Sequence, residues 1–334
     1  MRPERYVMTI QRPAATIAGL DLARSGARRV RVDLSVDAAH DRVLVDVWPG
    51  APLASAAPGD LLDVALGTGG GDPQDVLATQ VTAVDTMPGA VRVTAFAPSR
   101  ALSSTYVGRS WRLTTLGQVV TDLLDEGDVD AGDVVATLAL PAFHVDPHRD
   151  AWSVLHDLAR RTGNQITSTA KGAVSFAAAP GVQAGGGLGG LASAAGAVAA
   201  AAGFGSGDGE LREGAELLHF STGARATGTA LTRVTPSSSR AWFLLEASPD
   251  SGSDVEVVDV SLRSRDAADA ATAAAAAATS RSSRSARLRV PGRPDLRAGA
   301  VQKARGQSWR ILSAVHVLDA VDGYTCDLVL EADA

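Results

Sequence analysis

The stretch Trp309–Leu330, WRILSAVHVLDAVDGYTCDLVL, carries the clearest fold signal in this chain. Over Trp309–Leu318, the odd-numbered residues, which start with Trp309 and Ile311, alternate with the even-numbered ones, which start with Arg310 and Leu312. This is the period-2 pattern of a β-strand, whose successive side chains point to opposite faces. The pair Asp322-Gly323 is a strong tight-turn signal, and Tyr324–Leu330 has the composition of a returning strand. The stretch therefore predicts a β-hairpin.

A second hairpin, earlier in the chain, follows the same local pattern. Each is a strand, then Asp-x-x-x-Gly, then a strand: Thr79–Val84, Asp85–Gly89 and Ala90–Phe96 against Ser313–Leu318, Asp319–Gly323 and Tyr324–Leu330. A strand bounded by glycines precedes each hairpin, at Gly59–Gly67 and Gly299–Gly306. Because the two hairpins are separated by far more residues than a solenoid repeat contains, they indicate two related β domains and not a solenoid array. Because such hairpins are common, chance similarity is the alternative interpretation.

An amphipathic helix is expected after the first β region. Thr115 is its predicted N-cap, with Gln118 three residues later in a capping-box pattern. One apolar face and a terminating glycine complete the pattern: Leu116, Val119, Val120, Leu123, Leu124 and Gly127.

Further along, the chain changes character. A second helix should begin after Asp150 and end at Gly163, followed by a small hairpin around Lys171-Gly172. The uncharged segment Gly181–Gly207 is almost all Gly and Ala. A membrane-spanning helix needs about 20 mainly apolar residues, and large apolar side chains are few here. We therefore expect a linker or loop and no stable membrane insertion.

Together these patterns predict an α+β fold that is mainly β, with two similar half-barrel β domains flanking a small α/β insert. The expected divisions are 1–100 for the first β domain, 101–180 for the insert, 181–210 for the linker and 211–334 for the second β domain. The second β domain also contains an Ala-rich stretch over 266–284 with high helix propensity.

Composition narrows the class of protein. The chain has 334 residues with 31 Lys+Arg against 37 Asp+Glu, and its net charge of −6 makes the whole chain a poor polyanion binder. A single cysteine excludes an intrachain disulfide framework and fits a reducing compartment. The N-terminus shows no apolar stretch of a secretory signal. A secreted disulfide scaffold and a basic DNA-binding domain are thus excluded.

Two patterns resemble ligand sites without meeting their requirements. Gly185, Gly187 and Gly190 match G-x-G-x-x-G, but no βαβ pattern surrounds them, so no dinucleotide cofactor is expected. The acidic run Asp122–Asp133 has no register that puts Gly at position 6 and Glu at position 12 of a calcium loop. A solvated turn is the favoured interpretation of that run.

No metal-ligating or catalytic residue is assigned either. His144 and His148 are spaced i, i+4, which puts both on one face only in a helix, and Pro147 favours a loop. There is no G-x-S-x-G motif, and Cys326 sits mid-strand as a small buried hydrophobe. The six histidines show no local catalytic pattern, although a Ser/His/Asp site assembled only in three dimensions stays open.

Residues 281–310 hold nine basic residues against the single acid Asp295. A nucleic-acid groove usually interleaves aromatic residues for stacking, and only Trp309 is present. The favoured interpretation is a positive face that docks an acidic neighbour or faces water. The alternative is a basic stripe lining a channel that passes DNA or protein.

Several motifs resemble those of the baseplate hub proteins of contractile tails, the late control protein D family. The closing hairpin matches at Val315, His316, Gly323, Tyr324 and Thr325. Pro291–Gly299 resembles the family's Gly-x-Pro-x-Leu-x-x-Gly run, with Gly292, Pro294, Leu296 and Gly299 matching. Ala151–Phe176 is similar to its Trp-x-x-Leu-x-x-Leu-Ala helix and Gly-x-Val-x-Phe hairpin. The resemblance covers nearly the whole chain apart from about 181–210.

The resemblance implies a structural part of a phage tail or a phage-like contractile injection system, similar to the hub region of type VI secretion spike proteins. It implies a homotrimer around a central channel that joins a six-fold tail tube to a three-fold spike, with other baseplate proteins as partners. Because Ala334 follows the hairpin closely, we expect the spike to be a separate polypeptide. DNA or protein cargo would pass through the channel, and His316 and Tyr324 would be packing residues.

This expectation places the protein in the cytoplasm during assembly and then in the virion tail or injection particle, without catalysis. Two rival hypotheses come from other classes. One is a tail-associated cell-wall hydrolase, which requires a catalytic arrangement that the sequence does not reveal. The other is a membrane-associated binding module anchored by 181–207.

Overall fold

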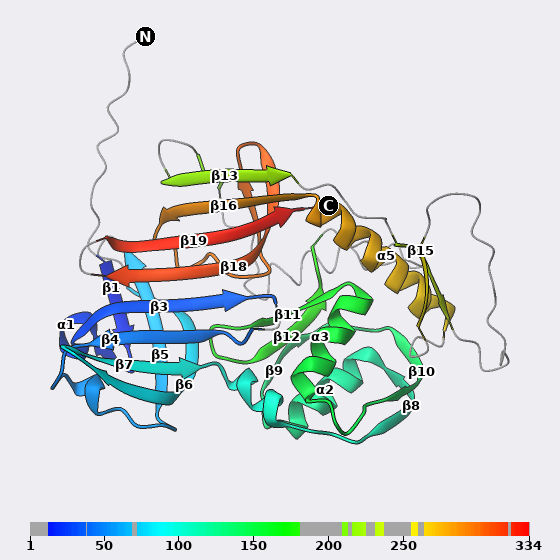
Figure 1. The fold of residues 1–334 in the computed structure, drawn as a ribbon, viewed down its shortest axis with the longest axis horizontal. Helices are drawn as coiled ribbons and strands as arrows, with labels where there is room; N and C mark the ends of the chain where they lie inside the picture. The colour runs from blue at the N-terminus through cyan, green and yellow to red at the C-terminus, as the bar shows by residue number, and fades with distance from the viewer. Residues whose placement is uncertain are drawn as a thin grey trace, which may run out of the picture.

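The computed structural model describes residues 13–37, 39–68, 72–180, 209–212, 216–224, 231–236, 255–259, 264–319 and 322–333. The fold is α+β and mainly β, as predicted. One twelve-stranded sheet dominates it, and a smaller α/β insert lies against one end of that sheet (Figure 1). The Gly/Ala segment 181–207 with its G-x-G-x-x-G match lies outside the described residues.

The large sheet is built from the two ends of the chain. Its strand order is β13-β16-β19-β18-β3-β4-β7-β6-β5-β1-β2. The twelfth strand, β17, pairs with β18 but is not part of this linear order. The strands of its first half are β1 (Pro13–Ile17), β2 (Leu20–Asp21), β3 (Ala27–Ser35), β4 (Arg42–Val47), β5 (Leu61–Thr68), β6 (Gln74–Met87) and β7 (Ala90–Phe96). Those of its second half are β13 (His219–Ala224), β16 (Arg284–Pro291), β17 (Val301–Ala304), β18 (Gln307–Asp319) and β19 (Gly323–Ala332).

The two halves join by strand pairing. The second part of β18 pairs antiparallel with β3, from Ser313 opposite Ser35 to Asp319 opposite Arg29. Alternating side chains of both halves point to one side and form a single apolar core, which contains Val32 of β3 and Leu328 of β19. The hairpins predicted around residues 85–89 and 319–323 are confirmed as β6–β7 and β18–β19.

The first hairpin differs from its prediction at the turn. Residues Asp85 to Met87 were expected in the turn, but β6 continues through them and Met87 pairs with Ala90. Only Pro88 and Gly89 form the turn, and Gly89 adopts a positive φ of 74°, an angle that glycine takes without steric cost.

The insert has its own apolar core. Its elements are β8 (Ser110–Thr115), α2 (Leu116–Glu126), β9 (Ala131–Val134), β10 (Ala139–His144), α3 (Ala151–Thr162), β11 (Asn164–Ser168) and β12 (Val174–Ala178). Both predicted helix starts are confirmed, since Thr115 accepts from the Gln118 backbone N–H and Asp150 from that of Ser153. The reciprocal half of the capping box is not made, because the Gln118 side chain donates to Asp122 instead.

The remaining elements are short except for one helix. They are α1 (Leu22–Ser25), the 3-10 helices η1 (Pro52–Ser55) and η2 (Pro98–Ser104), the paired strands β14 (Leu231–Pro236) and β15 (Val255–Asp259), and α5 (Arg265–Ser282). The helix α5 confirms the Ala-rich prediction and packs against α3 of the insert. Within the described ranges, no helix is long and apolar enough to cross a membrane.

Candidate functional site

The motif residues of the C-terminal hairpin form one buried polar cluster. His316 of β18 donates from Nε2 to the Leu296 carbonyl at 3.0 Å, since a carbonyl oxygen can only accept. Its Nδ1 then accepts from the Tyr324 hydroxyl at 2.8 Å and lies 3.2 Å from the Cys326 sulfur. His316 and Cys326 are fully buried. The cluster therefore fixes the neutral imidazole as the Nε2–H tautomer and ties the hairpin to the preceding loop.

The electrostatics of this cluster favour a neutral imidazole and a protonated thiol. Burial lowers the pKa of His316 to about 4, and the positive charge of Arg297 adds to the effect. Burial also raises the pKa of the Cys326 thiol to about 12. A nucleophilic cysteine needs a low pKa and access to a substrate, and this thiol has neither. The structure shows His316 and Tyr324 buried and hydrogen-bonded to each other inside the hairpin.

The glycines of the preceding loop follow from this packing. A Cβ on Gly292 would collide with the Tyr324 ring. Gly299 has a φ of +86°, and a Cβ there would lie 2.9 Å from Nε2 of Gln165. Both positions therefore require glycine, one for a close approach of the backbone to a ring and one for its backbone angle.

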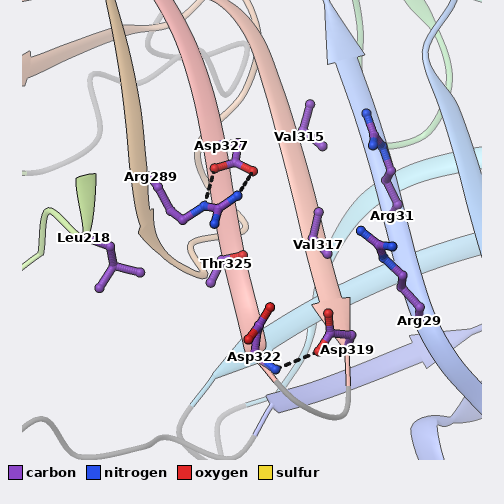
Figure 2. A pocket seen from close by; sticks show the side chains of 10 residues that line it. All are labelled: Arg29, Arg31, Leu218, Arg289, Val315, Val317, Asp319, Asp322, Thr325 and Asp327. Atoms are coloured by element: carbon purple, nitrogen blue, oxygen red, sulfur yellow. Dashed lines mark hydrogen bonds and ion pairs between the residues drawn. The ribbon is translucent and has the colours of Figure 1, made fainter. Parts of the chain in front are cut away.

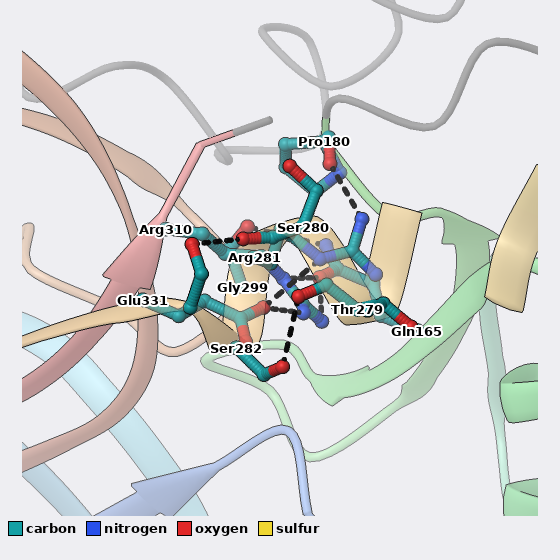
Figure 3. A network of polar contacts seen from close by, with 10 residues as sticks. Gln165, Pro180, Thr279, Ser280, Arg281, Ser282, Gly299, Arg310 and Glu331 are labelled. Carbon is teal, nitrogen blue, oxygen red and sulfur yellow. Dashed lines mark hydrogen bonds and ion pairs between the residues drawn. The ribbon is translucent and has the colours of Figure 1, made fainter. Parts of the chain in front are cut away.

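A second buried cluster links the insert to the second half of the sheet (Figure 3). Arg310 of β18 donates from Nε and Nη2 to Oε1 of Gln165 in β11, at 3.0 and 2.9 Å. Gln165 in turn donates to the carbonyl of Gly299 at 3.2 Å. Glu331 of β19 forms ion pairs with both Arg310 and Arg281 of α5. Sequence reasoning missed this cluster, because no local pattern relates residues so far apart.

Arg297 connects three parts of the chain. Its guanidinium is partly buried and donates to the carbonyl of Val76 in β6 at 2.7 Å and to that of Ser168 in β11 at 2.8 Å. Nearby, Asp41 is buried and accepts from the Ser35 backbone N–H at 2.8 Å. Burial raises the pKa of Asp41 to about 6 despite hydrogen bonds from serines and the charge of Arg297. Hydrogen bonds from Arg297 to main-chain carbonyl groups thus connect the two halves of the sheet and the insert.

One half-buried histidine, His40, resembles part of a hydrolase site. His40 lies with Nε2 2.7 Å from the Ser103 hydroxyl, but its Nδ1 faces the Ser99 hydroxyl at 3.2 Å. In a Ser/His/Asp triad a carboxylate holds that nitrogen, whereas the Asp150 carboxylate here caps α3 through Ser153. Burial and Arg100 lower the pKa of His40. The arrangement ties η2 to the sheet and lacks the orienting acid of a triad.

The other sequence candidates lie apart from these clusters. His144 of β10 contacts the Ser110 hydroxyl at 2.8 Å, and His148 lies in a turn. In the acidic run, Asp122 accepts from the Trp111 ring N–H at 2.6 Å. Across the described residues, no three His, Cys, Asp or Glu side chains gather as a metal site.

The outward face of the sheet is charged at the junction of the two halves (Figure 2). A shallow hollow of about 600 Å³ lies there, with Arg29 and Arg31 of β3 on one side and Arg289 of β16 on the other. Arg289 forms an ion pair with Asp327 of β19 at 2.6 Å. In the first half, Arg92 of β7 pairs in the same way with Asp46 of β4 at 2.7 Å.

The two halves correspond strand by strand. Directly opposed residues form an inward row in each half, which runs Val30, Val45, Val93, Val84 in the first and Phe220, Leu288, Leu328, Ala314 in the second. The outward rows beside them run Arg29, Asp46, Arg92, Asp85 and His219, Arg289, Asp327, Val315. Strands β3, β4, β7 and β6 of the first half thus match β13, β16, β19 and β18 of the second.

Backbone hydrogen bonds repeat at the same places. Gly59 N–H donates to the Val81 carbonyl at 2.8 Å, and Gly299 N–H donates to that of Ile311 at 2.8 Å. Each longer strand has an irregularity one residue further on, at Thr82 in β6 and at Leu312 in β18. The likeness inferred from two hairpins therefore extends over both halves of the sheet.

This arrangement is also found in solved structures. The chain has the fold of phage tail proteins. A 43 kDa tail protein of a Shewanella oneidensis prophage aligns with a TM-score of 0.61 at 12% identity, covering 96% of this chain and 98% of that protein. A tail protein from Neisseria meningitidis aligns with a TM-score of 0.66 at 11% identity, covering 97% of each chain.

A third similar structure comes from a secretion device. An Escherichia coli component of the type VI secretion system aligns with a TM-score of 0.54 at 11% identity, over 99% of this chain and 76% of that one. That protein is described as structurally similar to tail proteins of bacteriophage T4. No family model matches the sequence, and a search of curated proteins gave no match.

The tail-protein fold explains which predicted motifs carry structure. The Gly-x-Pro-x-Leu-x-x-Gly run supplies the Leu296 carbonyl to His316 and places Gly292 against Tyr324. The chemistry of the site is therefore that of a joint: buried, neutral or paired polar groups hold the halves and the insert together.

Proposed function

We propose that this protein is a structural baseplate hub of a phage tail or phage-like contractile injection system. It acts as a homotrimeric adaptor that joins a six-fold tail tube to a three-fold spike around a central channel, through which DNA or protein passes. The tail-protein fold over nearly the whole chain supports this role. The proposed domains are 1–100 and 211–334 for the β domains, 101–180 for the insert and 181–210 for the linker.

The observation that carries the proposal is the internal repeat. Three copies of a chain with two similar halves present six similar halves to a tube and three identical chains to a spike. The halves are joined head to tail, because β18 of the second half pairs with β3 of the first. A head-to-tail contact that repeats between copies closes into a ring when its rotation allows.

The mass of the purified protein tests this role, together with its symmetry in averaged particle images. A three-fold ring of about 100 kDa is expected from three chains of 34.1 kDa. It should show near six-fold features on one side and three-fold features on the other. A stable 34.1 kDa monomer that adds to neither tube nor spike would overturn the proposal.

A further inference from the structure

The strand β6 is paired along only part of its length on one side. Strand β5 pairs with it from Gln74 to Gln80, and Val81 bonds to the backbone of Gly59 and Asp60. Beyond this point, over residues 82–87, the described chain pairs with β6 only through β7 on the other side. Asp85 and Thr86 in this stretch are exposed. We name residues 82–87 the open edge of β6.

A second open edge lies at the far end of the sheet. Strand β13 pairs with β16 on one side, and no other strand of the described residues pairs with it. Its side chains are exposed except that of Phe220, which packs against the core. An unpaired edge offers backbone N–H and C=O groups to another strand.

The junction inside the chain supplies a template for joining these two edges. The part of β18 that corresponds to the open edge of β6 is covered by β3, with Ala314 opposite Leu34 and Val317 opposite Arg31. In the strand-by-strand match, β3 corresponds to β13. The strand that would cover the open edge of β6 is therefore a β13.

We propose that the open edge of β6 binds β13 of a second copy of this chain as an antiparallel strand. Carrying the internal register over places Met87 opposite Ser221, Thr86 opposite Thr222 and Asp85 opposite Gly223. The inference rests on the proposed hub and identifies the contact between its copies. Main-chain hydrogen bonds supply most of the affinity, as in other cases of strand addition.

Side-chain directions on the two edges agree with this register. Val84 packs against the core, as does Phe220 of β13, so Met87 and Ser221 both belong to the outward face. The matching internal residues, Val317 and Arg31, line the outward hollow of Figure 2. The contact therefore continues the core on one face and the charged surface on the other.

Disulfide cross-linking tests the contact in the full-length chain. In the variant Met87→Cys/Ser221→Cys, oxidation should join separate chains and give dimers and trimers on non-reducing gels. The native Cys326 is buried with its thiol pKa raised to about 12, so it does not compete. The matched control is Arg31→Cys/Val317→Cys, which places two cysteines at the same relation inside one chain and should oxidise without a change in mass.

A register control makes the result specific. In Met87→Cys/Thr222→Cys the second side chain points to the other face of the sheet, so cross-linking should fall at least tenfold. Cross-linking of Met87→Cys/Ser221→Cys no better than this control, while the internal pair oxidises, overturns the proposed contact. If the cross-link fails in this way but the wild-type protein is a trimer, the proposed hub is retained. The open edge of β6 would then bind a strand of another tail protein. A monomeric wild type without cross-links overturns both proposals.

Discussion

The guanidinium of Arg289 donates two hydrogen bonds to the carboxylate of Asp327, from Nε at 2.6 Å and from Nη2 at 2.8 Å. At the corresponding place in the first half, Arg92 donates to Asp46 at 2.7 and 3.0 Å. The basic residue therefore lies on β16 in the second half and on β7 in the first. These two strands do not correspond to each other, because β16 matches β4 and β7 matches β19. One cross-strand ion pair is kept with its charges exchanged.

This exchange predicts that the pair can be reversed. The side chains of Arg289 and Asp327 are 53% and 39% exposed, and ion pairs of such exposure contribute about 0.2–1 kcal/mol. Asp327→Asn should lower the free energy of unfolding by no more than about 1 kcal/mol. In urea unfolding, Arg289→Asp/Asp327→Arg should recover most of the stability that Arg289→Asp alone loses. A double variant less stable than Arg289→Asp alone would show that the two halves have lost this equivalence.

The close approach of Gly292 to the Tyr324 ring predicts a large penalty for a single methyl group. Gly292→Ala should destabilise the chain by about 3 kcal/mol or more, because the ring must leave its packed position. The matched control is Gly306→Ala, at a φ of +73° with open space around it, where only backbone strain of about 1 kcal/mol is expected. Urea midpoints of both variants check the difference. Equal midpoints would contradict the packing role of Gly292.

The buried amide of Gln165 predicts a loss on truncation of its polar end. Gln165→Leu keeps the volume but removes the acceptor of two Arg310 hydrogen bonds, and hydrogen bonds to charged groups contribute about 1.5–3 kcal/mol. Stability should fall by about that amount, and hydrogen exchange in β11 should rise. Gln118→Leu, at an exposed position of α2, is the control, with a change within about 0.5 kcal/mol. Unchanged exchange in β11 would argue against the cluster as the link to the insert.

Two buried groups predict opposite responses to pH. The pKa of His316 falls from 6.5 to about 4, so between these values the unfolded chain binds a proton that the native chain excludes. Stability due to His316 is therefore full above pH 6.5 and is lost as pH falls towards 4, by about 3 kcal/mol in total. Half-buried His156, whose pKa burial also lowers to about 4, acts with the same sign.

Asp41 acts in the other direction. Its pKa rises from 3.8 to about 6, so the native chain keeps a proton that the unfolded chain has released, and stability falls as pH rises through this window. Asp41→Asn should therefore steepen the loss of stability on acidification, whereas His316→Gln should flatten it. Urea midpoints from about pH 7 to about pH 4.5 measure both slopes. Parallel slopes for the two variants would contradict these assignments.

Local elements could be predicted from the sequence because their signals lie within a few residues. The N-caps Thr115 and Asp150 begin helices as expected, and both β-hairpins form. The capping-box partner was the exception, since Gln118 reaches Asp122 on the next turn of the helix. Side-chain competition of this kind depends on rotamers that a motif does not specify.

The joints could not be predicted. In both β18 and β3, apolar residues alternate with other residues along the strand, a pattern that would suit pairing with many strands. The sequence therefore does not specify that these two strands pair with each other. The contact of Gln165 with Arg310 depends on where the insert docks, and neither residue carries a local signal. The resemblance to a known family pointed to the motif residues around His316. Their geometry explains the two glycines, because Gly292 lies against the Tyr324 ring and Gly299 against the Gln165 amide.

The continuous sheet also has a consequence for how copies come together. Strand β3 meets β18 within one polypeptide, so the chain itself keeps their effective concentration high at any dilution. The proposed joint between β6 of one copy and β13 of another has no such tether and would depend on the protein concentration. Dilution should therefore separate whole chains while each retains its own internal joint. In the proposed ring, every second joint would thus be insensitive to concentration.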